Sequence, residues 1–518
     1  HRPPGRGPAP TPGCPGGPGT GLTRLTLVDV RRFPVLLGAL LALILASVGA
    51  SGMAGAVGTK KRTAASDWDV VLVLTDDQPT NTLAGMPYLN RLLLRKGINY
   101  TNAVVPTSLC CPSRTSLLTG QLTPDTGIYS NESDTGFGGY PAIKAAGLEK
   151  NTIATALDAA GYNTAYFGKY VNEYGPLYDG TAPPGWDTWR SFTTKQSGKY
   201  RNFGLTDAVP FGQKPKRASQ EFVTKYSTTF LGKEAADHIR TAPAGQPLFT
   251  VLAPYAPHSP FTAERKYRGA SRVPANYRNA SVMESDVSDK PTYVQQQPVS
   301  AAVEGEAPGI NLAKQMDTLR SVDDSVKALY DAVKQSGRLD RTLFVYVSDN
   351  GYMHGEHRLD GKGYPYLKST NVPLVVRWGA GSAGTVDDRL TIANVDIHAT
   401  ILQAAGLPNT SAGTSMLADR NSNGVPLYAT ESTSRVVRPP FCAWRTREEL
   451  FVRYGTGEEE FYDYRVDPYE LDNRVADPAY TTRVDELRGR ARAACSDPPP
   501  GFGPTFDLPR WHPVRGGT

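Results

Sequence analysis

The 518-residue sequence predicts an α/β protein, with a mostly parallel central sheet that is flanked by helices on both faces. Two observations support this fold class. Short apolar runs alternate with helical patterns along the body of the chain. Four of these runs also end directly in polar residues. Apolar residues make up 39% of the chain and charged residues 20%, so a large core is expected and a disordered or fibrous protein is excluded.

The four apolar runs are predicted to be buried strands. They span residues 69–74, 163–167, 248–253 and 342–347. In open α/β sheets, ligands bind beyond the carboxyl ends of the strands. The four strand ends lead into Asp76, Asp77, Lys169, His258, Asp349 and Asn350. One polar strand end is ordinary turn chemistry, but four of this kind predict a functional site.

Helical spacing of apolar residues predicts helices over 87–96 and 312–335, each followed closely by a glycine. A shorter helix is predicted over 113–118. Asp323 and Asp324 fall on the 312–335 helix, and we expect both on its solvated face.

The charge distribution argues against nucleic acid as a partner. Of the formal net charge of +6, residues 1–56 contribute +4 through five arginines and one aspartate. The remainder has 51 basic and 49 acidic residues, whereas a nucleic-acid-binding protein keeps its positive charge in the folded part.

The five cysteines are too few for a disulfide scaffold. The sequence also has no C-x-x-C pair, so a structural zinc site of that kind is not expected.

The N-terminal region predicts export. An apolar run over 33–48 follows Arg31 and Arg32 and precedes small residues, which is the pattern of a secretory signal peptide. We assign 28–56 to that signal and interpret 1–27, rich in proline and glycine, as an over-extended gene start. The alternative is a membrane anchor, but the run is shorter than a span of about 20 residues, so no stable membrane span is expected. The expected location is secreted or cell-envelope, or lysosomal in a eukaryote.

Two of the polar strand ends predict a metal site. Asp76, Asp77, Asp349 and Asn350 offer only oxygen ligands, which suit Ca²⁺ or Mg²⁺ better than zinc. A divalent cation would also relieve the repulsion among three carboxylates. Taken alone, the pair Asp76-Asp77 or the pair Asp349-Asn350 is equally consistent with an ordinary turn.

A second motif, at 106–120, places Cys110 just before the predicted 113–118 helix. Helix N-termini bind anions through free backbone N–H groups, and Arg114 adds a forked cationic donor for an oxyanion. The adjacent cysteines are also consistent with a buried apolar pair, a redox site or a plain thiolate nucleophile.

The run Cys110-Cys111-Pro112-Ser113-Arg114, followed by Leu118-Thr119-Gly120, resembles the signature of the formylglycine-dependent sulfatases. This family has the alkaline-phosphatase-like fold. The resemblance covers about 69–495. It implies that a formylglycine-generating enzyme converts Cys110 to formylglycine, with Cys111 at the variable position.

The resemblance also assigns the polar residues. It implies a calcium ion, with Mg²⁺ the less favoured alternative, on the ligands Asp76, Asp77, Cys110, Asp349 and Asn350. It implies formylglycine-supporting and sulfate-binding roles for Arg114, Lys169, His258 and Lys362. On this basis the hydrated aldehyde attacks the sulfur of a sulfate ester, His258 assists the departing alcohol, and the second hydroxyl then expels sulfate.

The run 168–174 most resembles the N-acetylglucosamine-6-sulfatase branch, so the expected substrate is a sulfated carbohydrate of that kind. Val171 stands where many sulfatases have a histidine, and the nearby Asn172 is a candidate replacement. His354 and His357 are further candidates for the substrate pocket.

The resemblance implies a catalytic domain over 67–435 and a small C-terminal α+β subdomain over 436–495. We expect a disulfide between Cys442 and Cys495 in this subdomain, worth roughly 2–4 kcal/mol. The residues that follow, 496–518, are expected to form a solvated Pro- and Gly-rich tail.

Of the remaining histidines, we expect His398 to be structural, and His238 and His512 to lie on the surface.

Two other functions stay open on the sequence alone. A phosphodiesterase or phosphonate monoester hydrolase would use the same cationic site, because phosphate and sulfate esters have similar shapes. A non-catalytic glycan-binding protein would result if Cys110 were never converted.

Overall fold

The computed structural model describes residues 66–510, apart from 178, 194–198, 208–218, 299–307, 382, 419–421 and 433–436. The expectations for 1–27, 28–56 and His512 lie outside the described residues. The chain divides into two units, His1–Thr59 and Lys60–Thr518, and all described residues belong to the second.

The second unit is built on an eight-stranded sheet with the order β13-β2-β12-β9-β1-β8-β4-β5. Its parallel centre consists of the four predicted strands, β9 (Thr342–Ser348), β1 (Asp69–Thr75), β8 (Leu248–Ala253) and β4 (Asn163–Gly168). The outer strands are β5 (Thr188–Ser191), β12 (Leu374–Trp378), β2 (Ile98–Tyr100) and β13 (Thr385–Asp387). Strand β12 runs antiparallel to β9 and β2, so the sheet is mostly parallel, as predicted.

The register brings the ends of the central strands to one edge of the sheet. Thr75 pairs with Ser348, the last residues of β1 and β9. Gly168 pairs with Ala253 in the same way at the ends of β4 and β8. The polar residues that follow these strands therefore start from one edge.

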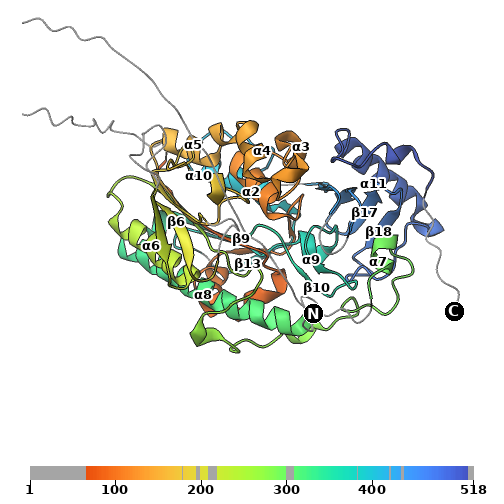
Figure 1. The fold of residues 1–518 in the computed structure, drawn as a ribbon, viewed down its shortest axis with the longest axis horizontal. Coiled ribbons are helices and arrows are strands. Elements are labelled where there is room, and N and C mark those ends of the chain that lie inside the picture. Colours follow the sequence, from red (N-terminus) through yellow and green to blue (C-terminus); the bar gives the residue numbers. More distant parts are fainter. Residues whose placement is uncertain are drawn as a thin grey trace, which may run out of the picture. The chain divides into compact units, whose positions relative to one another are not determined.

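Helices cover both faces of the sheet, and alternate residues of β1 pack against opposite layers. On one face, Val70 and Leu72 share a core with helices α2, α5 and α10. On the other, Val71 and Val73 share a core with α6 and α8. Figure 1 shows these helices above and below the sheet. Their bounds are α2 Cys110–Thr119, α5 Ile153–Ala159, α10 Ala393–Ala404, α6 Ser227–Thr241 and α8 Pro308–Gln335.

Smaller elements complete this part of the fold. The short helices are α1 Pro87–Leu92, α3 Thr123–Thr126, α4 Gly139–Ala145, α7 Thr292–Gln295 and α9 Leu367–Thr370. The short strands are β3 Ala103–Val104, β6 Phe203–Asp207, β7 Ser219–Val223, β10 Met353–His354, β11 Asp360–Gly361 and β14 Thr391–Ile392.

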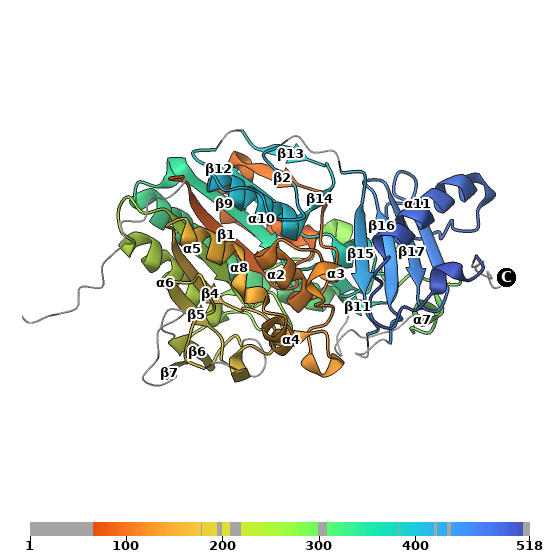
Figure 2. The ribbon, with the colours of Figure 1, turned by 90° about the horizontal axis from the view of Figure 1, so that it is seen from above.

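A second, antiparallel sheet lies toward the C-terminus (Figure 2). Its strands are β15 Val425–Ala429, β16 Phe441–Arg445, β17 Glu449–Tyr454 and β18 Glu459–Asp463. Helix α11 (Thr481–Ala494) packs Val484 and Leu487 against Phe451 and Phe461 of this sheet. The sheet begins with β15, before residue 436, because β15 supplies the edge strand next to β16.

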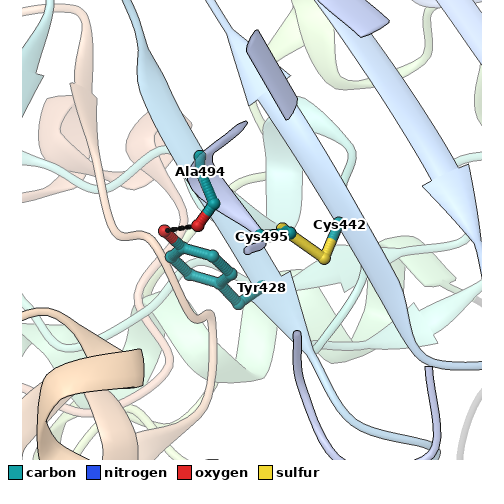
Figure 3. Close-up of a disulfide and its surroundings, with 4 residues drawn as sticks. All are labelled: Tyr428, Cys442, Ala494 and Cys495. Atoms are coloured by element: carbon teal, nitrogen blue, oxygen red, sulfur yellow. Dashed lines mark hydrogen bonds between the residues drawn. A yellow bond between two sulfur atoms is a disulfide. The ribbon is translucent and has the colours of Figure 1, made fainter. Parts of the chain in front are cut away.

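The structure joins Cys442 of β16 to Cys495, just after α11, as the expected disulfide (Figure 3). The Tyr428 hydroxyl donates to the carbonyl of Ala494 at 3.2 Å beside it. Most residues at 496–510 are exposed, in line with a solvated tail, but part of this segment packs on the protein. Phe502 is buried in the same cluster as the two cysteines, because its ring finds apolar surface there.

Two of the predicted helices begin or end at other residues in the structure. The predicted 87–96 helix stops at Leu92, and a 3-10 turn, Leu94–Lys96, leads the chain into β2. The predicted 113–118 helix starts earlier, so that Cys110 is its first residue rather than the residue before it.

The expectation for Asp323 was wrong. Its carboxylate is buried and accepts hydrogen bonds from the backbone N–H groups of Tyr88 and Leu89, at 2.9 and 2.7 Å. These are first-turn donors of α1 that have no partner within their own helix, so Asp323 satisfies them. Asp324 is half-buried and accepts from Lys266 at 2.7 Å.

His398 is structural, as expected: its ring is buried and Nδ1 lies 3.0 Å from the carbonyl of Leu117. His238 is half-buried rather than on the surface, and burial lowers its pKa to about 4. Between residues 66 and 510, no described helix is both long and apolar enough to cross a membrane.

Candidate active site

Cys110 lies at the centre of the polar cluster at the sheet edge, and its side chain is fully buried. Its Sγ donates to Oδ1 of Asp76 at 3.3 Å and accepts from Nζ of Lys362 at 2.7 Å. A longer contact of 3.9 Å reaches Oδ1 of Asp77. The thiol predicted as the reactive group therefore touches the predicted metal ligands and a predicted sulfate-binding lysine.

The candidate metal ligands converge from two strands that neighbour each other in the sheet. The backbone N–H of Asp77 donates to Oδ1 of Asp349 at 3.1 Å, and Asn350 Nδ2 donates to Oδ1 of Asp77 at 2.7 Å. Asp77 has a φ of 67°, a left-handed conformation that aspartate adopts more readily than most residues. Ligand atoms of Asp76, Asp77, Cys110 and His258 all lie within 4.8 Å of one another.

These residues fit a hard divalent cation. They supply carboxylate and amide oxygens, which Ca²⁺ and Mg²⁺ prefer. Asn350 Oδ1 is buried and has no hydrogen-bond partner among the described residues. A cation at this position would satisfy that oxygen.

Three cationic side chains surround the carboxylates. Lys169 Nζ lies 2.6 Å from Oδ2 of Asp76, and Lys362 pairs with Asp77. Arg114 Nε donates to Oδ2 of Asp349 at 2.8 Å.

Arg114 also donates through Nη1 to the carbonyl of Lys169 at 2.6 Å. Its Nη2 lies 3.7 Å from Asp76 Oδ2 and has no hydrogen-bond partner in the described part of the chain. Most of this guanidinium is therefore occupied by protein groups, so it holds Asp349 and Lys169 in place.

The formal charges of this cluster cancel. Asp76, Asp77 and Asp349 carry three negative charges when ionised, and Arg114, Lys169 and Lys362 carry three positive ones. A bound divalent cation would leave a net charge of about +2 in a buried site, which is a strong attraction for an anionic sulfate group.

The electrostatics disfavour a plain thiolate nucleophile. Burial, reinforced by the carboxylate of Asp76, raises the pKa of the Cys110 thiol well above its ordinary value, despite Lys169 and Lys362. Burial opposes ionisation of Asp76 too, but Lys169, His258 and Arg114 outweigh it and lower the pKa of Asp76 to about 2. The cluster thus holds ionised carboxylates beside a neutral thiol.

His258 stands at the opening of the cluster, with 27% of its side chain exposed. Its Nδ1 lies 2.7 Å from the carbonyl of Ser259, so Nδ1 carries a proton and donates it. Nε2 lies 3.6 Å from Oδ2 of Asp77. The ring packs on Tyr255, with 4.8 Å between centroids, which fixes its orientation.

His354 and His357 are both buried and held by protein partners, which argues against substrate contact. His354 Nε2 lies 2.9 Å from Oε1 of Gln315, and burial lowers its pKa to about 3. His357 Nδ1 lies 2.6 Å from Glu284 Oε2. Burial opposes protonation of His357, but Glu284 and Glu470 raise its pKa to about 9.

Asn172 is half-buried beside the second cysteine. Its backbone N–H is a hydrogen-bond partner of the Cys111 thiol. Its Oδ1 is buried and has no hydrogen-bond partner within the described ranges. Asn172 therefore stays a candidate for substrate contact.

The sequence interpretation missed Gln315 of α8. Its Nε2 donates to the backbone carbonyl of Asp77 at 2.7 Å, while its Oε1 meets His354. A usable signal was present: Gln315 falls between Leu312 and Leu319 on the apolar face of the helix, where a polar residue needs a partner.

The family model described as Sulfatase matches residues 69–407. The chain belongs to the sulfatase family. A second model, N-sulphoglucosamine sulphohydrolase, C-terminal, matches residues 355–495 of this sulfatase.

Relatives and a solved structure agree with this assignment. Human N-acetylglucosamine-6-sulfatase is 32% identical over 396 residues, covering 74% of this sulfatase and 68% of the relative. The extracellular sulfatase SULF-1 homolog of Drosophila melanogaster is 30% identical over 346 residues, covering 66% of this chain but 30% of the relative. A solved protein in complex with its substrate D-glucosamine-2-N,6-O-disulfate matches the fold with a TM-score of 0.68 and 18% identity, over 86% of this chain and 100% of that chain.

Proposed function

We propose that this protein hydrolyses sulfate esters of a sulfated sugar, of the N-acetylglucosamine-6-sulfate kind. The proposal includes conversion of Cys110 to formylglycine by a formylglycine-generating enzyme, and a resident Ca²⁺ ion. The observation that carries it is the contact of one buried thiol with both Asp76 and Lys362 inside a charge-balanced cluster.

In this proposal the formylglycine supplies a hydrated aldehyde as nucleophile, and the cation, held by Asp76, Asp77, Asp349 and Asn350, supplies positive charge for the sulfate oxygens. Lys169, beside Asp76, and Lys362, beside Cys110, add fixed cationic donors that are already positioned before substrate arrives.

His258 is the proposed proton donor to the leaving alcohol. Ser259 holds the proton on Nδ1, so donation toward the substrate must come from Nε2 of the cationic ring. Oδ2 of Asp77 lies 3.6 Å from that nitrogen. His258 and Lys362 are the partly exposed members of the cluster, which places the substrate on their side.

The proposed substrate class rests on two of the similar proteins. The human relative is named for N-acetylglucosamine 6-sulfate, and the solved protein binds a glucosamine disulfate. The name of the Drosophila relative, an extracellular sulfatase, supports the proposal that this chain is exported to the cell envelope or beyond.

The deciding experiment is the mass of tryptic peptide 97–114 from protein made in its own host. Conversion lightens this peptide by the difference between a thiol and an aldehyde, and fragmentation assigns the change to Cys110. Cys110→Ala and Cys111→Ala form a matched pair of variants. We expect sulfate release to vanish in the first and to persist in the second.

Sulfate release is measured on N-acetylglucosamine 6-sulfate, with an aryl phosphate diester as the control substrate. An unmodified Cys110 in active enzyme would refute the formylglycine mechanism. Faster turnover of the phosphate diester would refute the sulfatase function.

A further inference from the structure

A groove of about 510 Å³ lies between the first turns of α8 and residues 269–278. This volume is within the range of sites that hold small ligands. Three cationic side chains line it, Arg272, Arg278 and Lys314. Arg272 and Arg278 are exposed, and neither has a hydrogen bond or ion pair in the described part of the chain.

The one carboxylate among the lining residues is already engaged. Asp317 is buried, and its two oxygens accept from the backbone N–H groups of Gly269 and Ser271 at 2.6 and 2.7 Å. Asp317 therefore fixes the 269–278 segment against α8 without pairing with either arginine. Among the described lining residues, Arg272 and Arg278 therefore leave an excess of positive charge.

Both walls of the groove are connected to the candidate active site, one directly and one through His354. On α8, Gln315 follows the lining residue Lys314 and donates to the carbonyl of Asp77 at 2.7 Å. On the other wall, the Tyr277 hydroxyl donates to the carbonyl of His354 at 2.5 Å. The groove is therefore joined to the catalytic edge directly by Gln315, and through His354, whose ring contacts Gln315, by Tyr277.

We propose that this groove binds a second anionic group of a sulfated glycan chain whose scissile sulfate lies at Cys110. The inference rests on the proposed function and extends it from a single sulfated sugar to a chain. Guanidinium groups match the geometry of sulfate and carboxylate oxygens, so Arg272 and Arg278 are the proposed contacts. Ile310, 51% exposed at the groove, offers apolar surface to the ring of a sugar.

The test compares two double variants that each remove two exposed positive charges. R272A/R278A alters the groove, and R95A/K96A alters the exposed turn before β2. Both are made in full-length protein carrying Cys110→Ala, so that no turnover occurs. Binding of a heparin-derived decasaccharide and of N-acetylglucosamine 6-sulfate is measured by calorimetry at 0.15 M salt. At this salt concentration the Debye length is about 8 Å, so long-range charge attraction is largely screened.

We expect the decasaccharide Kd to rise about 10-fold in R272A/R278A, the loss of two charge-assisted contacts, and less than about 2-fold in R95A/K96A. The Kd of the monosaccharide should stay unchanged in both. Equal weakening by the two variants would show general charge attraction and overturn the proposal. An unchanged decasaccharide Kd in R272A/R278A would also overturn it.

Turnover separates this inference from the proposed function. The groove variant is also made with Cys110 intact and assayed on an aryl sulfate. Unchanged aryl-sulfate turnover with weakened decasaccharide binding supports the groove. If the unaltered enzyme releases no sulfate although Cys110 is converted, the proposed function fails while the binding comparison still decides the groove.

Discussion

Nζ of Lys362 lies 2.7 Å from Sγ of Cys110 and pairs with Asp77 at the same time. Lys362 directly follows β11, which pairs with β10 in a two-stranded hairpin. The hairpin thus holds a cation against both the thiol and a candidate metal ligand.

Lys362→Ala is expected to lower kcat/KM for a sulfate ester by about 10²-fold or more, because a pre-positioned donor to the sulfate is lost. The rate is expressed per converted Cys110, determined from the mass of peptide 97–114, so that poor maturation is not mistaken for poor catalysis. Lys368→Ala is the matched control, since Lys368 is also half-buried but lines a different cavity. A wild-type rate in Lys362→Ala would contradict the assignment.

Removal of the metal should abolish most activity reversibly. Dialysis against a calcium chelator leaves the three carboxylates balanced only by the three protein cations, with no net positive charge for the sulfate. We expect Ca²⁺ to restore sulfate release more fully than Mg²⁺, because Mg²⁺ keeps several of its waters, whereas this buried site supplies mainly protein oxygens. Full activity after verified removal of the metal would refute the calcium site.

His357 makes stability depend on pH. Burial opposes its charge, but Glu284 and Glu470 raise its pKa to about 9 from the ordinary 6.5. A raised pKa means that the folded state holds the proton more tightly. The stabilisation is therefore complete below pH 6.5 and is lost as pH rises through about 9.

The free energy of unfolding should fall by up to about 3 kcal/mol across this window. Glu460 overlaps the lower part of this window, because burial raises its pKa from 4.5 to about 7, and its contribution is largely lost above that pH. Denaturant unfolding is therefore measured between pH 7 and 9.5. In His357→Gln the decline should largely disappear, and an equal decline in that variant would place its origin elsewhere.

The disulfide closes a loop with a sequence separation of 53 residues. Replacing Cys442 and Cys495 with serine should lower the free energy of unfolding by roughly 2–4 kcal/mol, because the unfolded chain regains entropy. Reducing agent should destabilise the original protein to a similar degree and leave the double variant unaffected. Equal stability of the two proteins without reductant would contradict this expectation.

The sequence by itself determined the central sheet and most of the cluster. The apolar runs marked the four central strands, and the rule that ligands lie beyond strand ends selected Asp76, Lys169 and Asp349. The motif around Cys110 identified the Cys110 thiol as a further member of the cluster. These signals are local, because the burial of a strand and the chemistry of the turn after it are visible in neighbouring residues of the sequence.

The tertiary structure decided which groups meet. Arg114 appeared free to bind an oxyanion, but it is held by Asp349, 235 residues away. Gln315 meets Asp77 across 238 residues, and Asp323 caps a helix 234 residues away. Hydrophobic periodicity shows that such a position is buried, but not which partner faces it, because the partner is fixed only when distant elements pack together.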